Sequence, residues 1–129
     1  MKQNVKIKSY TDLDVYQRTY KLSIIVCTQV IIKLPKEEKF DLADQLRGSS
    51  KAIPRLIAEG FGKRNQKRGF IKYLDDAIAG NNETIVSLSH VKDIYHTHLN
   101  YSSVEKLIKE YEISGKQLFK LKQAWEKFT

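Results

Sequence analysis

Residues that interrupt helices or cross-link chains are scarce in this sequence. Two prolines and six glycines occur among 129 residues, which favours long helices over a turn-rich β fold. A single cysteine, Cys27, excludes an internal disulfide, and its apolar surroundings are typical of a buried thiol in a reducing cytosol. Zinc-ligand spacing, a phosphate-binding glycine loop and a nucleophile elbow are all missing. We therefore expect a cytoplasmic protein without enzymatic activity, cofactor or metal.

Long hydrophobic runs are missing as well. The most apolar segment, residues 22–34, contains several polar side chains and is too short to span a bilayer. Residues 1–11 are polar and basic, and they lack the hydrophobic stretch of a signal peptide. The sequence therefore predicts no membrane partner.

Positive charge, in contrast, is abundant. Lys and Arg number 23 against 15 Asp and Glu, which gives a net charge of +8. A protein with this charge concentrates near polyanions, and nucleic acid is the most abundant polyanion in a cell. The excess charge also fits a role in solubility alone. Composition leaves both interpretations open.

Apolar residues recur at helical spacing along most of the chain. The first helix is expected to begin near Asp12, because Thr11 and Asp14 have the spacing of a capping box. Six residues of this helix have the spacing of a single helical face: Leu13, Tyr16, Tyr20, Ile24, Cys27 and Ile31. Further apolar residues between positions 25 and 32 widen this face, so we expect it to be covered by other helices and by a neighbouring subunit.

Further helices are expected after the first. Pro35 should end the first helix and begin the second. Asn65 is the expected N-cap of a third helix, and Asn100 is the residue expected to end it. Ser102 and Glu105 have the spacing of a capping box for a fourth helix. Core positions expected in the third helix are Phe70, Leu74, Ala77 or Ile78, Asn81, Ile85, Leu88, Val91 and Tyr95.

Short links between these helices favour antiparallel neighbours. The predicted fold class is therefore all-α, an antiparallel up-down-up-down four-helix bundle. We expect a single domain over residues 1–129, with a short basic arm at its N-terminus.

The segment at residues 45–68 combines a helical apolar register with a proline and a run of cations. Pro54 has no N–H to donate, and its ring crowds the carbonyl of Ser50, so a helix that passes through it should bend or loosen. Gly60 and Gly62 are expected to mark the end of this helix.

Two groups of cations in this segment are the candidate nucleic-acid-binding residues. Arg47, Lys51 and Arg55 recur every four residues and would form one stripe of a helix. The second group consists of Lys63, Arg64, Lys67 and Arg68. If helical, the second group would form two adjacent columns. Cations spaced in this way bind successive phosphates without reading bases; the alternative is a solvated face without a ligand.

Acidic residues near this segment raise the question of a metal site. They are Glu59, Asp75, Asp76 and Glu83. A di-iron centre in a helical bundle requires two Glu-x-x-His pairs, and the chain has none. We therefore predict no metal. Instead we expect polar pairing, either with backbone groups freed by Pro54 or with Arg47 across helices, by Glu59, Asp76, Asn81, Asn82 and Glu83.

The seven tyrosines are not expected to form a stacking platform of the kind that single-strand binders use. Core spacing is found for Tyr16, Tyr20, Tyr95 and Tyr111. Spacing does not settle whether the other three belong to the core, and they are suited to a subunit interface: Tyr10, Tyr73 and Tyr101.

Three stretches carry a resemblance to a known family. They read DLDVYQRTYKL (residues 12–22), QLRGSSKAIPRLIAEGFGKR (residues 45–64) and FIKYLDDAIAGNNETI (residues 70–85). The chain resembles the bacterial 23S rRNA-intervening-sequence proteins, which commonly read close to QLRRAA-SIP-NIAEG in the middle stretch. Here Gly48, Ser49 and Ser50 replace Arg-Ala-Ala, and Leu56 stands where Asn is frequent.

The resemblance implies a four-helix bundle that assembles as a ring, typically a pentamer, without established enzymatic activity. A related group of basic pentameric bundles, the accessory proteins of diversity-generating retroelements, binds nucleic acid.

Two functions follow as hypotheses. The first is an oligomeric bundle that binds RNA or DNA through Arg47, Lys51, Arg55, Lys63, Arg64, Lys67 and Arg68. The alternative is a ring-forming scaffold for a protein partner, with no nucleic-acid role.

Overall fold

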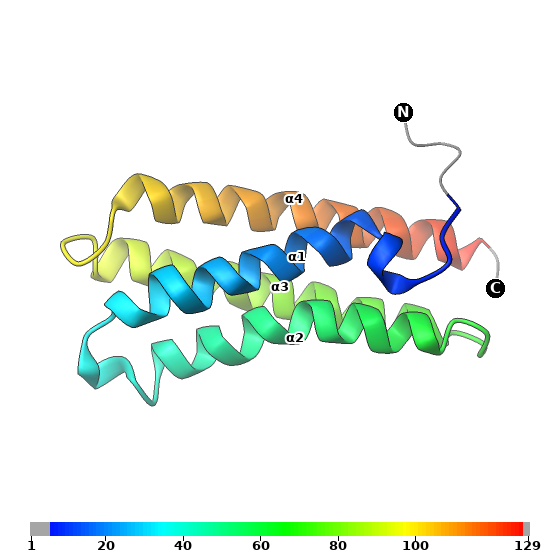
Figure 1. Cartoon of the computed structure of the whole chain (residues 1–129), viewed down its shortest axis with the longest axis horizontal. Coiled ribbons are helices and arrows are strands. Elements are labelled where there is room, and N and C mark those ends of the chain that lie inside the picture. The colour runs from blue at the N-terminus through cyan, green and yellow to red at the C-terminus, as the bar shows by residue number, and fades with distance from the viewer. Residues whose placement is uncertain (1–5, 128–129) are drawn as a thin grey trace.

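The computed structural model describes residues 6–127, and within that range the chain forms helices and turns without any strand. The long helices are α1 (Asp14–Ile25), α2 (Leu42–Gly62), α3 (Gly69–Ile94) and α4 (Tyr101–Glu126). In Figure 1 successive helices run in opposite directions along the long axis. The prediction of an all-α chain with four helices is confirmed, and the alternating directions are consistent with the predicted up-down-up-down bundle. Of the predicted basic arm, residues 1–5 lie outside the described range.

The start of the first helix differs from the prediction. A short 3-10 turn precedes α1, and the capping box at this turn is formed by Ser9 and Asp12. The Ser9 hydroxyl accepts a hydrogen bond from the backbone N–H of Thr11 at 3.2 Å, and Asp12 accepts one from the N–H of Ser9 at 3.0 Å. The predicted box of Thr11 and Asp14 was wrong, because Ser9 and Asp12 have the same spacing two residues earlier and form the box instead.

The buried face of α1 is rotated by one residue from the predicted face. Tyr20 and Ile24 were expected in the core but are 50% and 48% exposed, while Thr19 and Ser23 are buried in their place. The Thr19 hydroxyl donates to the carbonyl of Val15 at 2.8 Å, and the Ser23 hydroxyl donates to that of Tyr20 at 2.6 Å. Hydroxyls that are satisfied within their own helix can be buried at low cost, and this leaves apolar side chains on the surface.

The helical segment continues beyond α1 with altered pitch. A π-helical turn spans Val26–Val30, and a 3-10 turn spans Ile31–Lys33. Pro35 follows, but the second long helix does not begin there as predicted. Instead Lys36–Glu38 form another 3-10 turn, and α2 begins at Leu42, whose backbone N–H donates to the Glu38 carboxylate at 3.1 Å.

The helix α2 runs through Pro54 without interruption. The proline itself is buried. The contact between α2 and α3 is more extensive than that between any other two helices in the described part of the chain. Across this contact the Thr84 hydroxyl donates to the Ser49 hydroxyl at 2.8 Å. The helix α2 therefore stays continuous although Pro54 has no backbone N–H to donate, and it packs extensively against α3.

The fourth helix begins at a different cap from the predicted one. Asn100 accepts a hydrogen bond from the backbone N–H of Ser103 at 3.1 Å and one from the Ser102 hydroxyl at 2.8 Å. Asn100 was expected to end α3, and Ser102 with Glu105 was expected to open α4. Both predictions were wrong, because α3 ends at Ile94 and Asn100 is the N-cap of α4.

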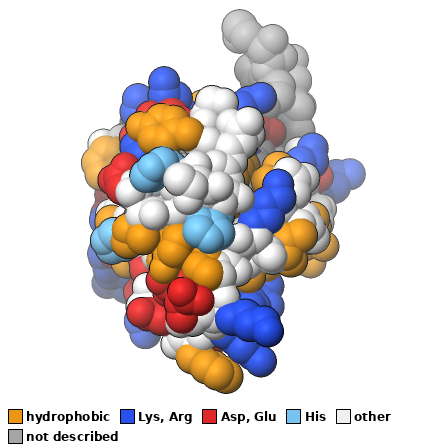
Figure 2. Space-filling model, turned by 90° about the vertical axis from the view of Figure 1, so that its left-hand side faces the viewer, with side chains coloured by type: hydrophobic (Ala, Val, Ile, Leu, Met, Phe, Trp, Pro, Cys, Tyr) orange, Lys and Arg blue, Asp and Glu red, His pale blue; other side chains and the backbone are white. Residues whose placement is uncertain are grey.

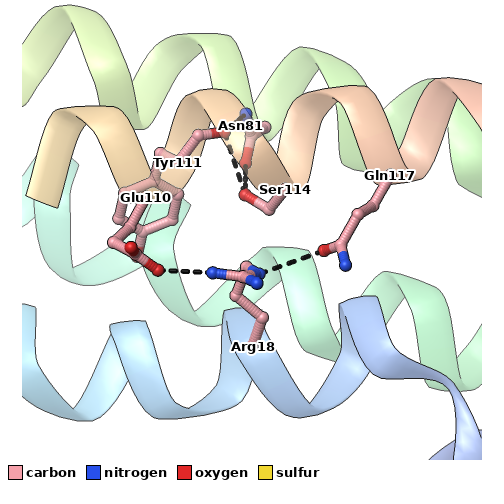
Figure 3. Close-up of polar contacts among 6 residues, drawn as sticks. All are labelled: Arg18, Asn81, Glu110, Tyr111, Ser114 and Gln117. Carbon is pink, nitrogen blue, oxygen red and sulfur yellow. Dashed lines mark hydrogen bonds and ion pairs between the residues drawn. The ribbon is translucent and has the colours of Figure 1, made fainter.

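A layer of small polar side chains crosses the apolar core (Figure 3). The Asn81 amide of α3 donates to the Tyr111 carbonyl of α4 at 2.8 Å, and the Ser114 hydroxyl donates to the Asn81 carbonyl oxygen at 2.8 Å. Asn81 is a core residue as predicted, but it binds α4 and not the backbone near Pro54. Gly115 leaves the room for this amide, since a Cβ there would lie 3.0 Å from its nitrogen.

Candidate nucleic-acid interface

The second group of predicted cations lies on the link between α2 and α3, which we call the basic link (residues 63–68). The basic link consists of turns closed by backbone hydrogen bonds, including those from Gln66 to Lys63 at 3.0 Å and from Gly69 to Gln66 at 3.0 Å. The two columns expected if this group were helical therefore do not form. Asn65 lies within the turns, and the N-cap position of α3 is held by Arg68.

The geometry of the basic link is tight. Arg68 has a φ of 61°, and it is the one non-glycine residue with positive φ in the described part of the chain. A left-handed conformation costs an L-residue about 1–2 kcal/mol, so the surrounding structure must hold it in place. At Gly69 a Cβ would overlap the carbonyl oxygen of Lys63, which explains the glycine at this position.

The cations of the basic link are exposed and largely unneutralised. No acidic residue occurs between Glu59 and Asp75, while the same stretch holds all four predicted cations and Lys72. Ion pairs within residues 6–127 involve cations other than these. Arg64 donates to the Phe61 carbonyl at 2.8 Å, and its guanidinium lies 4.1 Å from the centre of the Phe61 ring.

The helix α4 contributes an ion pair beside the basic link. The Lys122 ammonium donates to the Asp75 carboxylate at 2.7 Å, and this hydrogen bond raises the pKa of Lys122. Arg68 opposes that rise through charge repulsion, so its guanidinium contributes to the potential around Lys122.

The first group of predicted cations lines a groove between α1 and α2, which we call the α1–α2 groove. Arg47, Lys51 and Arg55 all face this groove, as their spacing predicted. Arg47 pairs with Asp44 at 3.6 Å and Arg55 pairs with Glu59 at 3.4 Å, each within α2. The predicted pairing of Arg47 with carboxylates of another helix is therefore wrong, because its own helix supplies a nearer partner.

The two groups of cations do not form one continuous patch. The helical rise places Lys63 about 12 Å beyond Arg55 along the axis of α2. The first group faces the α1–α2 groove, whereas the second group lies at the end of the helix. The structure therefore offers two basic sites that share one helix.

Tyrosines on the other wall of the α1–α2 groove were missed by the sequence analysis. The ring of Tyr16 contacts that of Tyr10 edge-on, with centroids 4.9 Å apart, and lies beside that of Tyr20, with centroids 6.0 Å apart and an interplanar angle of 28°. These three rings therefore form a cluster that the sequence analysis did not predict. The signal that could have found them is the spacing of Tyr16 and Tyr20, which are four residues apart on a helix.

A larger groove of about 820 Å³ lies between α1 and α4. Arg18 of α1 bridges it, since its guanidinium contacts the Glu110 carboxylate and donates to the Gln117 side chain at 3.2 Å (Figure 3). These bonds join α1 to α4, the least extensively packed pair of neighbouring helices. We interpret Arg18 as a structural bridge.

The acidic residues considered as metal ligands are dispersed. Asp75 pairs with Lys122 and Glu59 pairs with Arg55. Over residues 6–127 there is no group of three or more His, Cys, Asp or Glu side chains arranged to hold a metal ion. Nor does any helix of this range combine the length and apolar character required to cross a membrane.

Comparison with known proteins identifies the family of the chain. No curated protein matches it. A family model described as 23S rRNA-intervening sequence protein matches residues 11–120, a range that includes α1, α2, α3 and most of α4. The chain therefore belongs to the 23S rRNA-intervening sequence protein family.

Proposed function

We propose that this protein is an oligomeric, non-catalytic up-down-up-down bundle of the cytoplasm that binds RNA or DNA through the basic link. The observation that carries the proposal is the exposure of four cations on one tightly folded link. The sequence between Glu59 and Asp75 contains no acidic residue that would neutralise them. Exposed cations on a tightly folded backbone attract phosphates without the cost of ordering that backbone on binding.

Neighbouring elements strengthen the positive potential at this end of the bundle. The basic link leads directly into α3, whose N-terminus carries the positive end of the helix dipole. Lys72 adds a further cation from α3. Contacts of this kind position a phosphate backbone and do not read base sequence. We therefore expect affinity for many sequences, with a log–log salt slope of about −3.6 if four duplex phosphates are neutralised.

Assembly into a ring, pentameric as in the family, would repeat the basic link on every subunit. Several large apolar side chains are exposed on the described chain, including Ile32 at 70% and Phe119 at 53%, which favours burial against further copies. Repetition raises the effective concentration of weak phosphate contacts. Oligomerisation would thereby raise the overall affinity above that of the basic link in a single subunit.

The test is sedimentation and binding of the full chain with a structured RNA. Variants that reverse all four cations, Lys63→Glu, Arg64→Glu, Lys67→Glu and Arg68→Glu, should abolish a binding that weakens steeply with salt. Sedimentation should report an oligomer with and without RNA. Binding that ignores salt, or a monomer, would contradict the proposal.

The alternative is a ring that scaffolds a protein partner. It is supported by the opposite end of the bundle, which carries the links at residues 34–41 and 95–100 (Figure 1). Hydrophobic side chains lie beside acidic ones there (Figure 2). Phe40 is 86% exposed there, and Tyr101 is 52% exposed. An oligomer that binds no RNA at low salt would favour this function.

A further inference from the structure

The α1–α2 groove has two walls of different chemistry. Its volume is about 600 Å³. The wall from the N-terminal part of the chain consists of Tyr10, Tyr16, Tyr20, Ser23, Ile24 and Cys27. The wall from α2 consists of Arg47, Lys51, Pro54, Arg55 and Ala58. One wall is therefore mainly aromatic and apolar, the other carries three cations, and the lining contains no carboxylate.

The aromatic wall is partly exposed to solvent. Tyr20 is 50% exposed and Tyr10 is 37% exposed, while Tyr16 lies between them and is half-buried. Burial, together with the neighbouring tyrosines, raises the pKa of Tyr16, so this ring stays neutral at physiological pH. Neutral aromatic rings of this kind stack with nucleobases of any sequence.

The cationic wall has a regular spacing. Arg47, Lys51 and Arg55 follow one another by four residues, which places them about 6 Å apart along the axis of α2. This step is comparable to one nucleotide of an extended strand. Arg47 and Arg55 are held by Asp44 and Glu59, whereas Lys51 is exposed and has no ion pair within the described residues.

We infer that the α1–α2 groove binds unpaired nucleotides of RNA or DNA, with a base against Tyr20 and its neighbours and phosphates along Arg47, Lys51 and Arg55. The inference rests on the proposed function and names a second contact for the same ligand. A duplex does not fit this chemistry, because its bases are stacked inside and cannot reach the tyrosines. A second copy of this chain fits less well, because its net charge of +8 would meet a cationic wall.

The experiment uses labelled oligouridine and oligothymidine of about ten nucleotides, with a blunt RNA duplex as comparison. Tyr20→Leu keeps apolar bulk and removes the aromatic face, and Tyr101→Leu is the matched control on an exposed tyrosine of α4. Tyr20→Leu should weaken binding of the single strands by roughly tenfold, which is within the range for one stacked base. Duplex binding by Tyr20→Leu, and all binding by Tyr101→Leu, should stay unchanged. The two oligonucleotides show whether the groove prefers RNA or DNA.

A second measurement avoids substitution. Photocrosslinking of the wild-type protein to a thiouracil-substituted strand should label Tyr16 or Tyr20. Labelling confined to the basic link, or unchanged single-strand affinity in Tyr20→Leu, would overturn the groove inference and leave the proposed function intact. Failure of both strands and duplex to bind would overturn both. A change in oligomeric state in Tyr20→Leu, with affinity retained, would show that the groove is an interface between copies.

Discussion

Asn81 is a polar residue that the core accommodates because both the nitrogen and the oxygen of its amide are hydrogen-bonded. Its nitrogen donates to Tyr111 and its oxygen accepts from Ser114, in a position that is 1% exposed. Asn81→Ala removes both bonds and opens a small cavity, so we expect the free energy of unfolding to fall by about 2 kcal/mol.

The neighbouring Asn82 provides a matched control, since it lies on the same helix but is exposed. Asn82→Ala should change the unfolding free energy by less than about 0.5 kcal/mol. Urea unfolding followed by circular dichroism measures both variants. Equal stability of the two variants would contradict the role assigned to Asn81.

Arg68 combines a strained backbone with a candidate functional side chain. Glycine adopts a φ of 61° without steric cost, whereas alanine does not. We expect Arg68→Gly to be more stable than Arg68→Ala by about 1 kcal/mol in denaturant unfolding. Both variants lose the same charge and should lose nucleic-acid affinity equally. A more stable Arg68→Ala would show that the left-handed conformation is not under strain.

At the level of helices, the sequence predicted the presence of all four correctly but placed several of their ends incorrectly. Apolar periodicity located all four helices, because burial of a stripe is a property of many residues together. Their boundaries depend on single caps, and several sites had equivalent spacing. Ser9 with Asp12 competed with Thr11 and Asp14, and Asn100 competed with Ser102. Sequence alone did not rank these competing caps.

The basic link shows a second reason for missed geometry. Its cations were identified from composition, but its turns depend on the positive φ of Arg68 and on the space at Gly69. Neither property is visible in an apolar pattern. The tyrosine cluster was missed because Thr19 and Ser23 rotate the buried face of α1, and this leaves Tyr20 on the surface.

A hydrogen bond from the Tyr95 hydroxyl to the Glu38 carboxylate joins the link at residues 34–41 to the C-cap residue of α3. This bond, with burial, raises the pKa of Tyr95 from 10.0 to about 12. A raised pKa in the folded state means that the stabilisation is complete below about pH 10 and is lost as pH rises towards 12.

Tyr95→Phe removes this contribution. The variant should be less stable than the wild type at neutral pH, and its stability should fall less steeply above pH 10. Denaturant unfolding across this range measures the effect, with Tyr101→Phe as a control on an exposed tyrosine. Parallel pH profiles for Tyr95→Phe and the wild type would rule out the bond as the cause.

The whole molecule has ends of different character. One end carries the basic link and Lys72, whereas the other carries the acidic residues of the link at residues 34–41 with exposed apolar side chains. Net charge is +8 for the chain, but its function under our proposal depends on where that charge lies. Two variants with the same change in charge, one at each end, distinguish an effect of net charge from an effect of where the charge lies.

The most direct test of this account is RNA affinity as a function of salt in two double variants. Lys63→Glu with Lys67→Glu changes the basic link, and Lys36→Glu with Lys39→Glu makes the same charge change at the opposite end. We predict that the first variant loses most of its affinity and that its log–log salt slope becomes shallower by about 1.8, as for two lost phosphate contacts. The second variant should keep a slope close to that of the wild type. Equal losses in both variants, or no RNA binding by the wild type at low salt, would contradict the assignment of the basic link.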